Sequence, residues 1–123
     1  MNRRLFIASA LAANATPAPV VLLDDGGWCW FEDERALIIG DRLIFGTVAT
    51  GHKNPAINGQ IRVTEYNLKS GASSTFTLHD PARDENPKQW TDDHNSPAFL
   101  HRPDGKLLAL YSRHGTRNEI HYR

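Results

Sequence analysis

The chain has 123 residues, with 14 basic and 14 acidic side chains and a formal net charge of zero. This length allows one small domain and excludes two of ordinary size. The balanced charge removes the simplest case for binding nucleic acid or a membrane surface, since both need a basic excess. Charged residues make up 23% and hydrophobic residues 40% of the chain, which is typical of a globular protein. The single cysteine, Cys29, excludes an internal disulfide and a zinc site built from several cysteines.

The first 15 residues contain the three parts of an export signal in order. Residues 2–4 are a short basic region, residues 5–12 are apolar, and residues 13–15 form a small-residue cleavage site. A short amphipathic N-terminal helix is the alternative. We expect a signal peptide over residues 1–15, and a mature domain over 16–123 that is secreted or periplasmic. No apolar run reaches the roughly 18 residues that a membrane helix needs.

Beyond residue 20, short apolar runs alternate with turn residues, and no convincing helical period is present. This pattern predicts β-hairpins. Four strands are predicted over residues 36–39, 42–49, 60–66 and 75–78. Three further strands are predicted over residues 97–101, 106–112 and 119–122. The two-residue link Gly40-Asp41 indicates a tight hairpin between the first two strands.

The strands form two units that match each other in sequence. Ala36 matches Ala98, and the run over 42–44 matches the run over 106–108, about 62 to 64 residues later. Repeated four-stranded antiparallel units are typical of a β-propeller. We therefore predict an all-β fold made of propeller blades.

The predicted first blade covers about residues 28–80, and a partial second blade covers about 94–123. About one and three-quarter blades leave apolar faces and a raw sheet edge uncovered. The expectation is that the chain is the N-terminal part of a larger propeller. A ring of several copies is the alternative, less favoured because it would be built from incomplete units.

The second hairpin predicts that two histidines lie close together. A three-residue loop over 103–105 would place Leu100 opposite Leu108, and the same register extended places His94 opposite His114. Directly opposed strand residues have Cβ atoms about 4.5–5.5 Å apart. Histidine can give or take a proton near neutral pH, and two histidines satisfied by loop carbonyls are the alternative.

Three motifs carry a family resemblance: Gly-Gly-Trp-Cys-Trp-Phe over 26–31, Asp-Asp-His-Asn-Ser-Pro-Ala over 92–98, and Tyr-Ser-Arg-His-Gly over 111–115. Together they resemble the BNR-repeat β-propeller family that includes the propeller ulvan lyases, polysaccharide lyase families twenty-four and twenty-five. Members are secreted seven-bladed propellers several times longer than this chain. The resemblance implies β-elimination at a uronic acid of an anionic polysaccharide.

The resemblance also implies site residues. It makes His94 a proton-transfer residue working with a tyrosine, and it makes His114 a residue that binds or neutralises the uronate. Asn95, in the motif of His94, is a predicted substrate contact. Arg113 and Arg117 suit carboxylate or sulfate and are predicted contacts as well. The tyrosine and a neutralising arginine belong to later blades of the same parent protein, so we expect this chain alone to be inactive.

Two other functions stay open: a non-catalytic glycan-binding propeller and a sialidase-like glycoside hydrolase. A hydrolase needs a carboxylate pair or an arginine cluster, for which Glu32 and Asp33 are weak candidates. No cofactor is expected for the chemistry; the family allows a structural cation, but no ligands are assigned. Asp92 and Asp93 are interpreted as closing a turn.

The other aromatic and histidine residues receive structural interpretations. We expect packing between blades for Trp28, Trp30 and Phe31. No pairing is predicted for His52, His79, His101 and His121.

Overall fold

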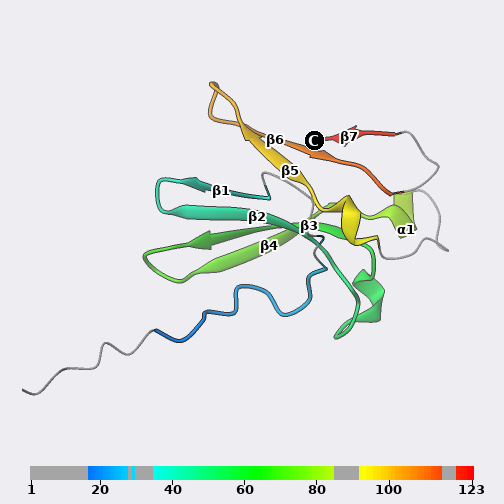
Figure 1. Cartoon of the computed structure of the whole chain (residues 1–123), viewed down its shortest axis with the longest axis horizontal. Coiled ribbons are helices and arrows are strands. Elements are labelled where there is room, and N and C mark those ends of the chain that lie inside the picture. The colour runs from blue at the N-terminus through cyan, green and yellow to red at the C-terminus, as the bar shows by residue number, and fades with distance from the viewer. Residues whose placement is uncertain (1–16, 28, 30–34, 85–91, 115–118) are drawn as a thin grey trace, which may run out of the picture.

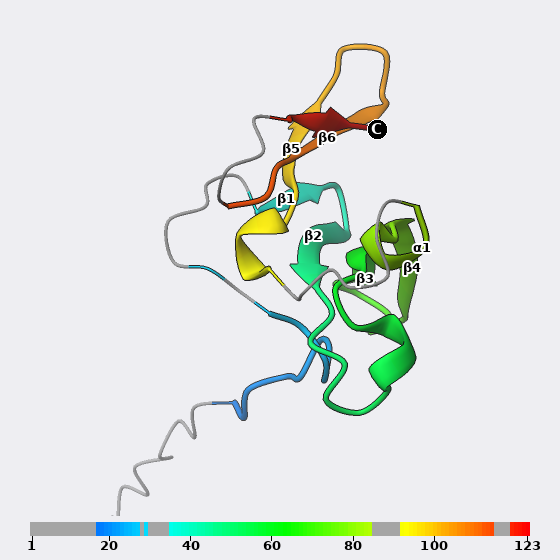
Figure 2. The same cartoon turned by 90° about the vertical axis from the view of Figure 1, so that its right-hand side faces the viewer.

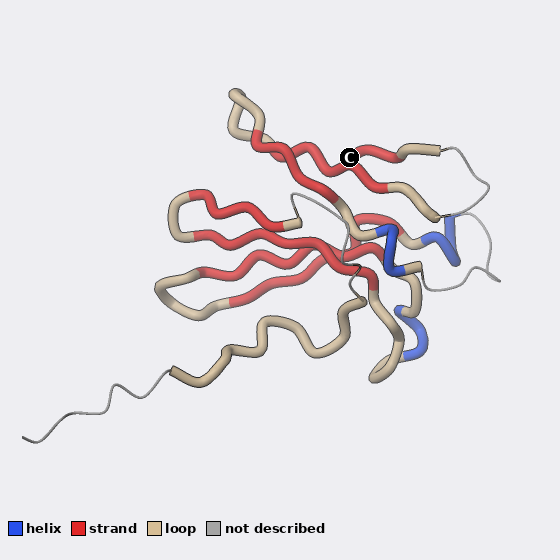
Figure 3. Tube along the Cα trace, in the orientation of Figure 1, coloured by secondary structure: helices blue, strands red, loops and turns tan. Residues whose placement is uncertain are grey.

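The protein is described by a computed structural model over residues 17–27, 29, 35–84, 92–114 and 119–123. Two antiparallel sheets dominate the structure, with few helices (Figures 1 and 3). The four-stranded sheet consists of β1 (Ala36–Ile39), β2 (Arg42–Val48), β3 (Ile61–Asn67) and β4 (Ser73–His79), in that order. The three-stranded sheet consists of β5 (Ala98–His101), β6 (Leu107–Tyr111) and β7 (His121–Tyr122). The short helices are η1 (Pro55–Ile57), α1 (Pro81–Asp84) and η2 (Asp93–Asn95).

The seven predicted strands are all present, with ends that differ by no more than about two residues. The all-β class and the antiparallel order are therefore confirmed. No propeller is detected in the described part of the chain. The predicted export signal lies outside the described residues. None of the described helices is long and apolar enough to cross a membrane.

Both predicted hairpin turns are confirmed. Ile39 pairs with Arg42 around the two-residue link, and Gly40 has a φ of 60°, a left-handed conformation that glycine adopts without steric cost. In the second hairpin, the Arg102 amide donates to the Lys106 carbonyl at 2.9 Å, and Gly105 has a φ of 79°. Local turn residues thus set the register of each hairpin.

The strand pairing in the structure shifts the alignment of the two sequence repeats by one residue before the hairpin turn. Leu37 pairs with Ile44, and Leu100 pairs with Leu108. With Ile44 matched to Leu108, Leu37 corresponds to Leu100, and the match of Ala36 with Ala98 is wrong. The physical reason is the turn, because a three-residue loop replaces a two-residue link and shifts the strand before it.

The core lies between the two sheets. Figures 1 and 2 both show the three-stranded sheet above the four-stranded one. Ile44 and Val63 from the lower sheet pack against Phe99 and Ala109 from the upper sheet. Gly46 allows close approach, because a Cβ atom there would lie 2.4 Å from Cγ of a proline just before β5, Pro97. The sheets are therefore fixed together at the start of β5, beside the histidine-containing motif.

The N-terminal segment is held against the end of β2. Gly27 forms an isolated antiparallel bridge with Val48. Cys29 is buried and free. Burial limits the access of reagents to this thiol.

Candidate functional site

The two predicted histidines meet at one end of the three-stranded sheet. The rings of His94 and His114 stack with centroids 4.6 Å apart and an interplanar angle of 28°. Their proximity is therefore confirmed. The extended strand register is wrong, because pairing stops at Ala98 and Leu110 and His94 lies in the short helix η2. His94 therefore contacts the ring of His114 from the short helix η2 and not from a strand.

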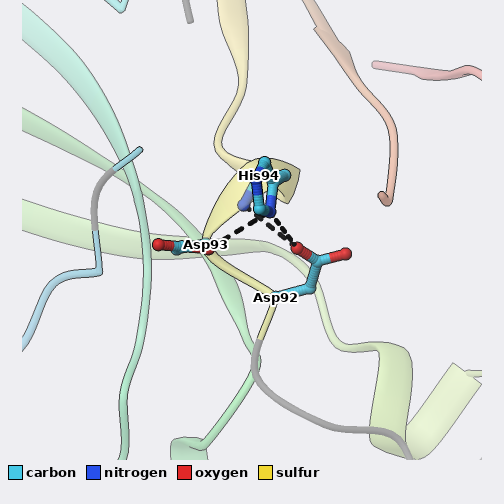
Figure 4. A group of neighbouring side chains, drawn as sticks. All are labelled: Asp92, Asp93 and His94. Carbon is cyan, nitrogen blue, oxygen red and sulfur yellow. Dashed lines mark hydrogen bonds and ion pairs between the residues drawn. The ribbon is translucent and has the colours of Figure 1, made fainter. Parts of the chain in front are cut away.

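The Asp92 carboxylate forms hydrogen bonds with both histidines. Its Oδ1 caps η2 by accepting the His94 backbone N–H at 3.1 Å, and the same oxygen lies 2.8 Å from His94 Nδ1 (Figure 4). Its Oδ2 accepts the His114 backbone N–H at 2.8 Å. The interpretation of Asp92 as a turn residue is confirmed, but its contact with His114 was not predicted.

The Asp92 contact determines which His94 nitrogen carries the hydrogen in the neutral ring. An ionised carboxylate can only accept a hydrogen bond, so the hydrogen between the two groups belongs to Nδ1. In the neutral ring, this leaves Nε2 with a lone pair. The arrangement can therefore present a base to a ligand from Nε2 while Asp92 fixes the orientation of the ring.

Asp93 adds a second carboxylate to His94. Asp93 Oδ1 lies 3.2 Å from His94 Nδ1 (Figure 4). One ligand atom from each of Asp92, Asp93 and His94 falls within 4.8 Å of the others, so these three residues could contact a cation. A cation at Nδ1 would replace the hydrogen bond to Asp92, since coordination needs a lone pair on Nδ1 and the hydrogen bond needs a hydrogen there. The predicted structural cation therefore remains without assigned ligands.

An open pocket of about 270 Å³ lies beside His94. Ser96 and Ser112 contribute to its lining, and Ala98, Leu110 and Ile120 form an apolar side. A sugar ring presents both apolar C–H faces and hydroxyls, so this lining has the right character for one. The pocket is open to solvent, and His94 is one of the residues that line it.

The structure describes two of the three predicted substrate contacts, Asn95 and Arg113. Asn95 is buried, and its Oδ1 has no hydrogen-bond partner among the described residues. Arg113 is half-buried directly before His114 in the chain. Arg117 lies outside the described residues, as do Glu32 and Asp33. Substrate contact by Asn95, Arg113 and Arg117 therefore stays a prediction.

The first repeat contains the same carboxylate contact without a histidine. Asp25 Oδ1 accepts both the backbone N–H and the hydroxyl of Thr50, each at 2.7 Å. The Thr50 hydroxyl bond is the main reason that the pKa of Asp25 lies below its usual value, although burial opposes this shift. Thr50 is the position that matches His114 in the sequence repeat. The paired aspartates at 24–25 and 92–93 were the signal that could have identified Asp92.

A second ring cluster was missed. The His79 ring lies 5.6 Å from the Tyr111 ring and 5.3 Å from the His121 ring, and the rings of Tyr111 and His121 stack. No pairing was predicted for His79 or His121, and the structure brings their rings together. These contacts join β4 of one sheet to β6 and β7 of the other. His52 and His101 are exposed, and the predicted packing of Trp28, Trp30 and Phe31 concerns residues outside those described.

Searches with this chain found no matching family model, curated protein or solved structure.

Proposed function

We propose that this chain provides part of the active site of a secreted polysaccharide lyase. The lyase cleaves an ulvan-like, uronic-acid-containing glycan by β-elimination. The observation that carries the proposal is the stacked pair of His94 and His114, held by one carboxylate beside an open pocket. In this proposal the two sheets are the first two blades of a propeller, and later blades of the same protein complete the site.

The proposed reaction assigns the proton transfer to His94. Nε2 of His94 takes the proton from C5 of the uronate, while the Asp92 carboxylate holds Nδ1–H. The electrons of the C5–H bond form the C4=C5 double bond, and the bond from C4 to the leaving oxygen breaks. That oxygen takes a proton from a tyrosine of another blade. The products are a chain with a free hydroxyl and a chain that ends in an unsaturated uronate.

The proposed role of His114 is to bind the uronate carboxylate. Charge builds up next to this carboxylate as the C5 proton leaves, so a positive group beside it stabilises the transition state. A histidine ring can be neutral or charged near neutral pH, so the pair can supply one neutral base and one charged group. Arg113 and Arg117 extend the positive surface towards carboxylate or sulfate groups, and Asn95 is a further proposed contact.

Binding tests the proposal on the 123-residue chain. We would titrate polyuronate oligosaccharides, and neutral oligosaccharides of the same length, while recording the histidine ring resonances by NMR. The polyuronate should shift His94 and His114 and leave His101 unchanged, because His101 is exposed on the far end of β5. His94→Ala should remove the shift at His114 or weaken it strongly, and His101→Ala is the matched control.

Turnover tests the proposal on a protein that carries the complete site. There, His94→Ala should abolish the ultraviolet absorbance of the unsaturated uronate while glycan binding persists. Equal shifts with neutral and uronate glycans would contradict the proposed substrate class. Saturated products would indicate a hydrolase, and binding without any product would indicate a glycan-binding protein.

A further inference from the structure

Two carboxylates converge on one ring nitrogen at the end of the three-stranded sheet. Asp92 Oδ1 lies 2.8 Å and Asp93 Oδ1 lies 3.2 Å from His94 Nδ1 (Figure 4). One hydrogen on Nδ1 satisfies one acceptor, and Asp92 is the closer of the two. The hydrogen bond therefore accounts for the position of Asp92 but not for the second negative charge beside the same nitrogen.

No permanent positive charge balances these two carboxylates in the described part of the chain. No described lysine or arginine forms an ion pair with Asp92 or Asp93. In the first repeat, by contrast, Lys53 Nζ lies 2.7 Å from Asp24 Oδ2. Two negative charges thus face a single imidazole in the second repeat, and a divalent cation would balance them.

The spacing of the three ligand atoms fits a first-row metal ion. Atoms bound to one zinc ion at about 2.0–2.2 Å lie about 2.8–3.6 Å from one another in octahedral or tetrahedral geometry. The distances from Nδ1 to the two carboxylates fall in this range, and the three ligand atoms all lie within 4.8 Å of one another. Asp92 is also fixed in place by the backbone N–H groups of His94 and His114, so part of the site is already formed.

We propose that Asp92, Asp93 and His94 bind a divalent transition-metal ion of the zinc class, reversibly and in exchange for the Nδ1 hydrogen. The imidazole favours such an ion over Ca²⁺ and Mg²⁺, which prefer oxygen ligands. The side chains of Asp92 and His94 are 20% and 28% exposed, and that of Asp93 is 48% exposed. Water can therefore reach the ion and complete its coordination.

Binding of the ion changes which nitrogen of His94 carries the hydrogen. The Nδ1 lone pair forms the bond to the metal, so the hydrogen of a neutral ring moves to Nε2, and a charged ring releases one proton to solvent. The metal-bound ring then has no lone pair on Nε2 with which to accept a proton. In a protein that carries the complete site, the ion should inhibit turnover. This consequence rests on the proposed function, whereas the binding of the ion does not.

Isothermal titration calorimetry of the 123-residue chain with Zn²⁺ tests the binding. We expect one tightly bound ion per chain, with an affinity that falls from about pH 7.5 to about pH 5.5 as histidine becomes charged. Asp93→Asn and His94→Gln should each weaken the binding by at least about 10-fold, since even residues that only support a metal ligand have effects of this size. His101→Gln is the matched control, because this exposed histidine lies at the other end of β5. Circular dichroism checks that each variant remains folded.

Nitrogen NMR of the histidine rings locates the ion. Saturating Zn²⁺ should move the hydrogen of His94 from Nδ1 to Nε2 and leave His101 unchanged. Equal Zn²⁺ affinities of the wild type, Asp93→Asn and His94→Gln would place the ion elsewhere and overturn the proposal, as would an absence of binding. Equal affinities for Ca²⁺ and Zn²⁺ would overturn the proposed class of metal. Binding at His94 without inhibition of turnover would support the metal site and contradict the role of Nε2 in the proposed function.

Discussion

Removing the Asp92 carboxylate should destabilise the protein and release both histidines. Asp92→Ala removes the cap of η2, the acceptor for His94 Nδ1–H and the acceptor for the His114 backbone N–H. Loss of an N-cap costs about 1 kcal/mol, and hydrogen bonds to a charged acceptor contribute about 1.5–3 kcal/mol each when buried. The Asp92 side chain is 20% exposed, so solvent replaces part of this loss. We expect the free energy of unfolding to fall by about 2–4 kcal/mol.

Urea unfolding followed by circular dichroism and by tryptophan fluorescence measures this change. Asp93→Ala is the matched control: the neighbouring carboxylate is 48% exposed and lies 3.2 Å from His94 Nδ1. It should cost less than about 1 kcal/mol. Nitrogen NMR of the His94 ring also reports which ring nitrogen carries the proton. Asp92→Asn should reduce the population with the proton on Nδ1. Equal costs for the two alanine variants would refute the assignment of Asp92 as the residue that holds the site together.

Three further predictions concern the scaffold. Because the Thr50 hydroxyl lowers the pKa of Asp25, ionised Asp25 stabilises the fold above its unfolded-state pKa of about 3.9, and this contribution is lost as the pH falls through the lower folded-state value. Asp25→Asn should therefore flatten the decrease of unfolding free energy below about pH 4, measured by urea titration at several pH values. Gly46→Ala should cost about 1–3 kcal/mol through its clash with Pro97, and adding Pro97→Ala should restore part of this loss in the same unfolding assay. Cys29 is buried, so a thiol reagent should modify it only as fast as the protein unfolds, and immediate reaction in native buffer would contradict this.

The strands and both hairpins could be predicted because their signals are local. Alternating apolar residues and the turns around Gly40 and Gly105 fix which residues pair. The proximity of His94 and His114 followed from the same hairpin, although the strand extension used to predict it was wrong. The wrong strand extension did not change the prediction that the two histidines are close, because both lie at the same end of a short sheet.

Contacts that join different sheets could not be predicted in this way. The His79 ring meets the His121 ring 42 residues later, across the space between the two sheets. No periodic pattern in the sequence predicts this ring contact, because the contact depends on how one sheet packs on the other. Packing in turn depends on the fit of Gly46 against Pro97, which requires the strand register first. The arrangement of the sheets as propeller blades is a further level of packing and stays a proposal.

The location of the candidate site can be understood from the repeat. In both repeats a carboxylate accepts the backbone N–H at the exit of the second strand: Asp25 at Thr50, and Asp92 at His114. The contact serves a structural purpose in the first repeat, where Thr50 also donates its hydroxyl. In the second repeat the same contact holds one histidine and brings another, His94, against the carboxylate. Two histidines added to an existing structural contact would then create a reactive pair without any change to the strands. In this proposal the candidate site lies where the first repeat has only a structural contact. Asp92, which the sequence analysis interpreted as a turn residue, is then the residue that contacts both histidines.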